Sequence, residues 1–323
     1  MGRNDEAIKW LLDSKDPSIR YLTLTEIIGE PEESKEVQSA KTRITKGPRL
    51  QALLAGQQAD GGFGVHHYRK WAGTHWRLVS CVELGVPKDN KAVRKAAETV
   101  LVWLGRTRPP KIDGLWRAHA SLEGNALAVC TRLGLAHDSR VARLAERLVE
   151  WQWPDGGWNC DTRKKADHSS FYESLVPLWG LIEYSHETGD RDSSKASERA
   201  SEFFLKHRLF RSCKTQEIIN PEWLKLHYPL YWHYDILQAL RILQLGSKLN
   251  DPRVREALDI IESKRLKDGR WGPEGYYWFP KGRTSTGKKR ISSVEVVDWG
   301  RDGPNEMITL NALRVLKDSG RIK

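Results

Sequence analysis

The sequence has few cysteines, and no two of them stand close together. They form no CxxC pair, and they are Cys81, Cys130, Cys160 and Cys213. Isolated cysteines favour a reducing compartment. The chain also lacks any apolar run approaching the ~18 residues of a membrane span, and its first residues, MGRNDEAIKWLLDSKDPSIRYL, are too charged for a secretory signal. These absences predict a cytoplasmic protein with no transmembrane segment.

The chain has fewer acidic than basic residues. The 53 lysines and arginines outnumber the 42 aspartates and glutamates, which gives a formal net charge of +11 and an isoelectric point near 9.4. A balance this basic points to an anionic partner, either a small-molecule substrate or a nucleic acid. The chain has the composition of a globular protein, with 14 tryptophans, and its 323 residues suffice for one large domain or two small ones.

An Asp-Gly turn followed by an aromatic residue recurs along the chain. The copies are ADGGFG, IDGLW, PDGGW and KDGRW, at residues 59–64, 112–116, 154–158 and 267–271. Three of these turns follow a stretch with apolar residues at i, i+3, i+4 and i+7, which predicts helices buried on one side only. These helices are predicted at residues 89–105, 138–153 and 251–266.

Helices of a second kind follow the turns. Their sequences are apolar around most of the helix circumference, as expected of helices packed on both sides, and they occupy residues 74–85, 122–134, 166–185, 231–246 and 304–320. The alternation of half-exposed and fully buried helices predicts an all-α fold, an (α/α) toroid of about five helix-pair repeats with an inner and an outer ring. Residues 1–47 are predicted to add an N-terminal helical cap to the repeat domain of residues 48–323, in one continuous globular unit.

The repeats resemble those of a known superfamily. The stretches QQADGGFG, WQWPDGGW and KDGRWG resemble the Gln-Trp-type repeats of the α/α-toroid superfamily, which includes squalene–hopene-type terpenoid cyclases and protein prenyltransferase β-subunits. The resemblance covers roughly residues 48 to 323 and implies the toroid scaffold. The DxDD acid of the cyclases does not occur in the sequence. Of the zinc pattern of the prenyltransferases, Asp167 and His233 have counterparts, while Ser169 stands in the place of the cysteine.

Four residues are the candidate catalytic groups: Asp161, Asp167, His233 and Asp235. Each lies near an aromatic residue and near the start of a predicted inner helix, where the mouth of the ring is expected. A carboxylate buried in an apolar, tryptophan-rich cavity has a raised pKa and can act as a general acid or base. The alternative for several of these acids is an N-cap, and Asp167, ahead of HSSFYES, fits that role.

The loops before the inner helices supply the candidate substrate-binding cations. These loops cover residues 66–77, 105–119, 161–168, 208–228 and 279–293, and each contains at least two arginines or lysines. If the loops converge on one mouth, they form an electropositive funnel for an anionic ligand; the alternative is solvated loops on a basic protein. The cations singled out are Arg69, Lys70, Arg163, Lys164, Lys165 and Arg290.

Four tryptophans are the candidate cavity walls: Trp76, Trp158, Trp232 and Trp299. Their π-faces can stabilise a carbocation or stack a nucleobase, and the alternative is that they anchor turns between the two layers. No cofactor is predicted. Cys160 with His168 and His233 would make a zinc set, but the sequence has no paired-ligand spacing, so zinc is disfavoured. Mg²⁺ is expected only if the substrate is a diphosphate.

Three functions fit these features. The first, which the repeat resemblance favours, is an isoprenoid cyclase- or transferase-like enzyme whose cavity holds a prenyl chain while the basic rim binds a diphosphate. The second is a DNA-repair type of enzyme, a base-flipping glycosylase or abasic-site lyase, in which the same basic cleft grips phosphates and Asp235 or a lysine does the chemistry. The third is a non-catalytic ring that binds a ligand in its central hole.

The nucleic-acid hypothesis predicts that the protein retards single- or double-stranded DNA on a gel. Because that binding would rest on contacts between loop cations and phosphates, it should weaken steeply as salt is added. An electrophoretic mobility shift over a salt series measures this. Absence of retardation, or retardation that salt leaves unchanged, would count against the hypothesis.

Overall fold

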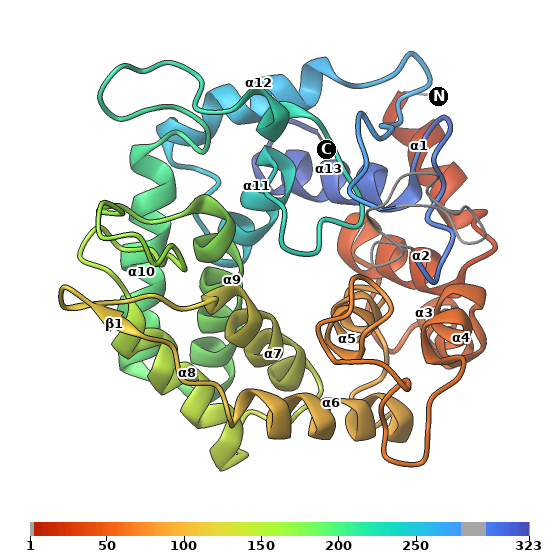
Figure 1. The fold of residues 1–323 in the computed structure, drawn as a ribbon. Coiled ribbons are helices and arrows are strands. Elements are labelled where there is room, and N and C mark those ends of the chain that lie inside the picture. Colours follow the sequence, from red (N-terminus) through yellow and green to blue (C-terminus); the bar gives the residue numbers. More distant parts are fainter. Residues whose placement is uncertain (1–2, 279–294, 323) are drawn as a thin grey trace, which may run out of the picture.

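Helices make up most of the structure (Figure 1). The structure is a computed structural model that describes residues 3–278 and 295–322. The described residues include two strands of two residues each, β1 (Lys111–Ile112) and β2 (Leu115–Trp116), which pair as a small antiparallel hairpin. The fold is therefore all-α, as the sequence predicted. None of the described helices is both long and apolar enough to cross a membrane.

Five largely buried helices form the interior of the molecule. They are α5 (Thr74–Glu83), α7 (Ala120–Arg132), α9 (Phe171–Thr188), α11 (Ile236–Leu245) and α13 (Glu306–Asp318). Each packs against the next in this order, and α13 packs in turn against a π-helical segment near the N-terminus, η1 (Thr23–Ile28). Most residues of these helices are buried, which confirms the prediction of helices packed on both sides.

Two of the interior helices begin later than their apolar pattern predicted. Helix α11 begins at Ile236 because Asp235 is extended, with φ −143° and ψ 164°, and caps the helix with its carboxylate. Helix α9 begins at Phe171 because the residues before it are held in the preceding turn, where the Ser169 amide donates to Asp155 Oδ2 at 2.7 Å. A cap at α11 and a turn contact before α9, neither of which the apolar periodicity reveals, therefore set these boundaries.

Four amphipathic helices lie at the periphery in Figure 1. They are α6 (Lys91–Leu104), α8 (Ser139–Trp151), α10 (Arg191–Lys206) and α12 (Arg255–Ser263). Helices α6, α8 and α12 fall within predicted ranges. The sequence did not predict α10 as a repeat helix, because over its first turns the buried stripe consists of small residues, namely Ser193, Ala196, Ser197, Ala200 and Ser201.

The N-terminal residues form short helices that pack on one another and on α13. These are α1 (Arg3–Leu12), α2 (Pro17–Leu22), α3 (Lys35–Arg43), η2 (Ile44–Lys46) and α4 (Pro48–Leu54). Helices α1 and α2 contact α13, as does η1. Two 3₁₀ segments, η3 (Pro221–Leu224) and η4 (Pro252–Val254), precede α11 and α12. The beginning of the chain therefore lies against its last helix.

The Asp-Gly turns fasten the peripheral helices to the interior. Trp158 of PDGGW is fully buried, and its indole N–H donates to the Leu148 carbonyl of α8 at 2.9 Å. Trp271 of KDGRW repeats this contact with the Ile261 carbonyl of α12 at 2.7 Å. Gly156 has a φ of +100°, and any side chain there would press into the backbone of α10. The recurring motif is thus a turn anchor between layers.

A close crossing of α7 and α9 depends on two glycines. A Cβ at Gly180 in α9 would lie 2.6 Å from the Gly124 carbonyl oxygen in α7, too close for a real contact. We expect Gly180→Ala to lower the free energy of unfolding by about 1–3 kcal/mol, measured by urea denaturation. The matched control is Gly246→Ala, whose Cβ would meet a flexible side-chain methyl at 3.3 Å and should change stability by less than ~0.5 kcal/mol. Equal effects of the two substitutions would contradict a glycine-dependent crossing.

Candidate functional site

Asp161 and Asp167, two of the predicted catalytic acids, lie in the loop before α9. Hydrogen bonds from the Arg163 guanidinium hold the pKa of Asp161 down at about 2. The Asp167 side chain is 85% exposed, and a hydrogen bond with His168 lowers its pKa as well. Both carboxylates are therefore ionised at neutral pH, and neither has the raised pKa that a general acid requires.

Asp235 and His233, the other two predicted groups, are more deeply placed. Asp235 is fully buried, and its two carboxylate oxygens accept backbone N–H groups at 2.8 and 3.1 Å, so it serves as the N-cap of α11. His233 stacks between Trp232 and Tyr277, with ring centroids 4.0 and 3.4 Å away. Burial lowers the pKa of His233 to about 3, which keeps the imidazole neutral.

Two of the four predicted tryptophans, Trp76 and Trp232, belong to one aromatic cluster near the starts of α5 and α11. Its other members are Trp71, Tyr231, His233 and Tyr277. The rings fill their space, since the adjoining cavity measures about 20 Å³, room for one water molecule at most. Trp76 and Trp232 therefore pack into this cluster, and Trp158 and Trp299 are buried apart from it.

The predicted cations remain in the loops. Lys70 lies 4.7 Å from the Trp232 ring, so it joins the aromatic cluster, and Arg163 is bonded to Asp161. Four of them are exposed, namely Arg69, Arg163, Lys164 and Lys165. Arg290 lies outside the described residues. Exposed loop cations are compatible with phosphate binding, so nucleic-acid binding stays a prediction that the gel-shift experiment tests.

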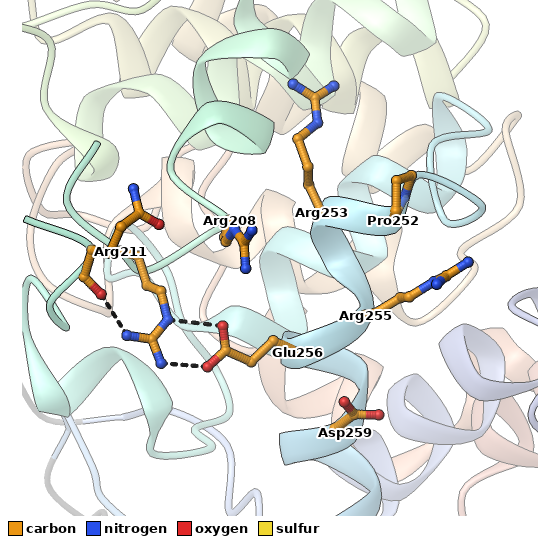
Figure 2. Close-up of a pocket in the computed structure, with 8 residues that line it drawn as sticks. Arg208, Arg211, Pro252, Arg253, Arg255, Glu256 and Asp259 are labelled. Carbon is orange, nitrogen blue, oxygen red and sulfur yellow. Dashed lines mark hydrogen bonds and ion pairs between the residues drawn. The ribbon is translucent and has the colours of Figure 1, made fainter. Parts of the chain in front are cut away.

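An outer groove between α10 and α12 is also rich in arginine (Figure 2). Its volume is about 600 Å³. Arg211 already makes a bidentate pair with Glu256, with Nε 2.8 Å from Oε2. Arg253 is likewise bonded to Glu202 and Asp251, at 2.8 and 2.7 Å. Since an incoming anion would have to displace these carboxylates, the groove is a weak candidate.

A larger cavity, of about 970 Å³, lies where α5 and α7 end rather than where the inner helices begin. Residues of the second half of α9 and of α11, α13 and η1 complete its wall. Each of these six elements places a charged side chain on the cavity: Glu26, Glu83, Arg132, Glu183, Arg241 and Arg314. Apolar side chains line the rest, among them Leu22, Val82, Val86, Trp179, Ile242, Leu245 and Met307.

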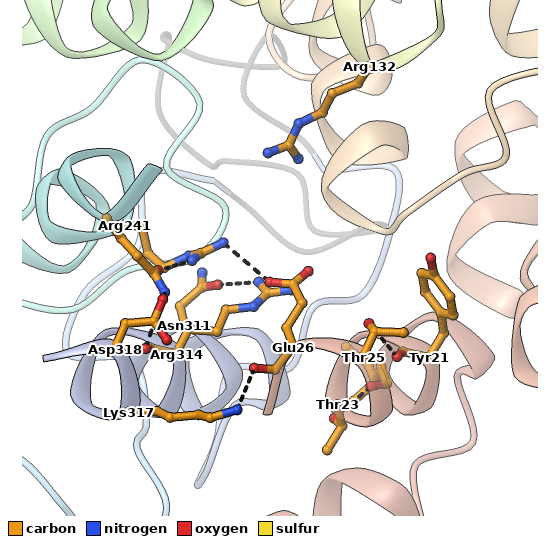
Figure 3. Close-up of polar contacts among 12 residues, drawn as sticks. Tyr21, Thr23, Thr25, Glu26, Arg132, Arg241, Asn311, Arg314, Lys317 and Asp318 are labelled. Atoms are coloured by element: carbon orange, nitrogen blue, oxygen red, sulfur yellow. Dashed lines mark hydrogen bonds and ion pairs between the residues drawn. The ribbon is translucent and has the colours of Figure 1, made fainter. Parts of the chain in front are cut away.

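Ion pairs join these charged groups across helices (Figure 3). Arg314 Nη2 donates to Glu26 Oε1 at 2.6 Å. Arg132 donates to Glu183 Oε1 at 2.6 and 2.9 Å. Arg241 also points at Glu26, but its Nη2 is 3.8 Å from Oε2. Burial and the neighbouring Arg314 lower the pKa of Arg241 to about 9. The guanidinium groups therefore stand in an electropositive environment that their carboxylate partners only partly neutralise.

Glu83 differs from the other carboxylates of the cavity. The Tyr228 hydroxyl donates to Glu83 Oε2 at 3.2 Å. Burial raises the pKa of Glu83 in spite of the arginines nearby. For Glu26, by contrast, the favourable charge of Arg314 and other arginines outweighs burial, and its pKa is lowered. A carboxyl group of raised pKa on a cavity wall is a candidate general acid.

Three guanidinium groups share two carboxylates on this wall, because Arg132 pairs with Glu183 while Arg314 and Arg241 both face Glu26. The other charged side chains of the lining carry two positive and three negative charges, and they are Glu32, Lys41, Lys88, Asp89 and Asp318. The buried Nε of Arg314 has no hydrogen-bond partner among the described residues. An unsatisfied donor beside an arginine without a close carboxylate suits the binding of an anion.

The sequence analysis did not single out the cavity residues, although each left a signal. An isolated charge stands near the end of each apolar inner stretch, at Glu83, Arg132, Glu183, Arg241 and Arg314. A charge on a helix that is buried all round needs a partner on another helix. The site predicted from the sequence lies at the starts of the inner helices, so it does not include these charged residues.

Comparisons with known proteins are sparse. No family model matches the chain, and no curated protein matches it. Among solved structures, the chain is similar to the type II terpene cyclase MstE from Scytonema in its apo form, with 16% identity and a TM-score of 0.47 over 99% of this chain and 98% of that one. An identity this low does not indicate which cavity residues act, so their roles depend on the contacts described above.

The raised pKa of Glu83 makes its contribution to stability dependent on pH. Between the ordinary carboxyl pKa and the higher pKa of the folded state, Glu83 is ionised in the unfolded chain but protonated in the folded one. The free energy of unfolding therefore falls as the pH rises through this range. We expect Glu83→Gln to gain stability relative to the native protein as the pH rises above about 4, measured by urea unfolding at several pH values. The matched control is Glu98→Gln, which removes an exposed partner of Arg140 and should change the free energy of unfolding by less than about 1 kcal/mol. A pH-independent difference for Glu83→Gln would contradict the assignment.

Proposed function

We propose that this protein is an enzyme that binds an anionic substrate in the cavity where α5 and α7 end, with Glu83 as its general acid. The substrate class we propose is an isoprenoid that carries a diphosphate, and the reaction class is cyclase- or transferase-like. The observation that carries the proposal is the convergence of three arginines and one carboxyl of raised pKa on a single cavity.

Arg241 is the central anion-binding residue in this proposal. Arg132 and Arg314 each hold a carboxylate at 2.6 Å, whereas Arg241 reaches one at 3.8 Å. A diphosphate offers several oxygen acceptors in the geometry that guanidinium groups bind bidentately. Its negative charge would also offset the mutual repulsion of the three arginines, which is costly while they are buried close together.

The size and the apolar lining of the cavity support a ligand with a hydrocarbon portion. Its volume of about 970 Å³ is near the upper end of the ~300–1,000 Å³ typical of small-molecule sites. Apolar side chains such as Val82, Ile242 and Met307 line it between the charged groups, and they would gain from covering a prenyl chain. Trp179, rather than the tryptophans predicted from the sequence, offers the indole face on this wall.

The surroundings of Glu83 favour transfer of its proton to the substrate. Burial raises the pKa of the carboxyl and so favours its protonated form in the resting state. When its O–H bond breaks and the proton passes to the substrate, the carboxylate left behind accepts the Tyr228 hydroxyl and feels the charges of Arg132 and Arg241. Stabilisation that grows as negative charge develops is the kind that accelerates a reaction.

We also propose that the helices form an (α/α) toroid, with residues 1–47 as a helical extension of the repeat domain of residues 48–323 in one continuous unit. The packing order from α5 through α13 to η1 supports this arrangement. In such a ring the six charged side chains would surround a common axis. Mg²⁺ would accompany the substrate if that substrate is a diphosphate.

Binding and turnover can be separated experimentally. We expect the native protein to bind farnesyl or geranylgeranyl diphosphate more tightly than the uncharged prenyl alcohol, as measured by isothermal titration calorimetry. Arg241→Gln should weaken binding of the diphosphate about 10- to 100-fold, since it removes charged hydrogen bonds. Glu83→Gln should bind normally and form no product, as followed by extraction and mass spectrometry.

The matched control for Arg241→Gln is Arg253→Gln, which removes an arginine of the outer groove and should leave binding unchanged. Circular dichroism and the melting temperature verify that each variant is folded. Failure of the native protein to bind either diphosphate, or equal binding by Arg241→Gln and the native protein, would refute the proposed substrate site.

A further inference from the structure

A second cluster of reactive side chains lies away from the cavity, where α7 and α9 begin. One ligand atom from each of His119, Cys160 and Glu173 lies within 4.8 Å of the other two. His119 directly precedes α7, Cys160 follows the PDGGW turn, and Glu173 is in the first turn of α9. The cluster shares Cys160 with the zinc set considered from the sequence, but it contains neither His168 nor His233.

We propose that this cluster is a binding site for a zinc-type divalent metal ion. His119 Nδ1, Cys160 Sγ and Glu173 Oε1 would be its three protein ligands. The choice of metal follows from the donor atoms, because a thiolate with an imidazole and one carboxylate suits zinc, whereas Mg²⁺ and Ca²⁺ prefer oxygen donors alone. The thiolate and the carboxylate together carry two negative charges, which match a divalent cation.

The carboxylate is already oriented for this role. Glu173 Oε2 accepts the backbone N–H of Ser121 at 3.0 Å, which fixes the side chain between α7 and α9. Its other oxygen, Oε1, faces His119 Nδ1 at 3.1 Å, close to the separation of two ligand atoms that share one metal ion. A hydrogen bond to the non-ligating oxygen is the usual way in which a protein holds a metal-binding carboxylate in place.

The site is open on one side. The His119 side chain is 69% exposed, while that of Glu173 is 12% exposed, so an ion held here is reachable from solvent. Three protein ligands leave the fourth tetrahedral position to water or to a group of a substrate, which is the pattern of catalytic rather than structural zinc sites. Without a metal, the same atoms form an ion pair and a thiol contact, and the experiment distinguishes the two states.

The proposed metal site does not depend on the proposed function of the cavity. Arg132, at the cavity, ends α7, roughly 18 Å along the helix axis from Ala120, which begins it. Substitutions in one site therefore leave the other intact, and the metal test reads absorption rather than turnover. Failure of either proposal can be recognised by itself.

The test is a titration of the reduced, EDTA-treated full-length protein with Co²⁺. A thiolate bound to Co²⁺ gives an intense near-ultraviolet charge-transfer band, and tetrahedral Co²⁺ absorbs in the visible. We expect these bands to saturate at one equivalent and to disappear when Zn²⁺ is added. Absence of the charge-transfer band would overturn the proposal.

Variants assign the band to the cluster. Cys160→Ser should abolish it, and His119→Ala should weaken Co²⁺ binding at least about tenfold. The matched control is Cys213→Ser, because Cys213 Sγ lies 3.3 Å from His207 Nδ1 and makes a thiol–imidazole pair elsewhere; this variant should keep the band. Loss of the band in Cys213→Ser and its retention in Cys160→Ser would refute the site.

A measurement on the native protein removes any dependence on the folding of variants. We expect one equivalent of Zn²⁺ to protect Cys160, but not Cys213, from alkylation by iodoacetamide, as identified by peptide mass spectrometry. Alkylation of Cys160 at the same rate with and without Zn²⁺ would contradict the proposal.

Discussion

The pairing of charged side chains around one cavity is the constraint on which the arrangement of the inner helices depends. Arg314 is buried, and a buried charge without a partner costs several kcal/mol. Glu26 meets Arg314, and Arg132 meets Glu183, so each charge is satisfied by a different element. The first of these pairs also ties the beginning of the chain to its last helix.

The two ends of the inner helices have different characters because different side chains fill them. Where the helices begin, stacked rings such as Trp71 on Tyr231 leave almost no space. Where α5 and α7 end, arginines and carboxylates hold the helices around a cavity of about 970 Å³. Tyr228 links the two regions, because the segment before α11 carries it inward to Glu83. A ligand of the cavity would thus meet polar groups on the wall and apolar ones between them.

The sequence predicted the fold better than the site. The alternation of helix types followed from local patterns, and the structure confirms the helices. Trp158 was predicted as a cavity wall, and its hydrogen bond to the Leu148 carbonyl instead fits the alternative of a turn anchor. The predicted acids were chosen for lying at helix starts beside aromatic residues, where the structure gives Asp235 a capping role and leaves Asp167 in solvent. Local spacing identifies a cap or a loop, but it does not reveal which carboxyl has a raised pKa on a cavity wall, as Glu83 has.

The sequence by itself determined the all-α class, the order of the helices and the turns between them, because apolar periodicity and turn-forming residues act over a few neighbouring positions. Only the tertiary structure decided which end of the inner helices holds a cavity, which arginines share it with Glu83, and that Cys160 lies beside His119 and Glu173. Those distances join residues from separate helices and loops, and they are fixed by how the elements pack rather than by their spacing along the chain.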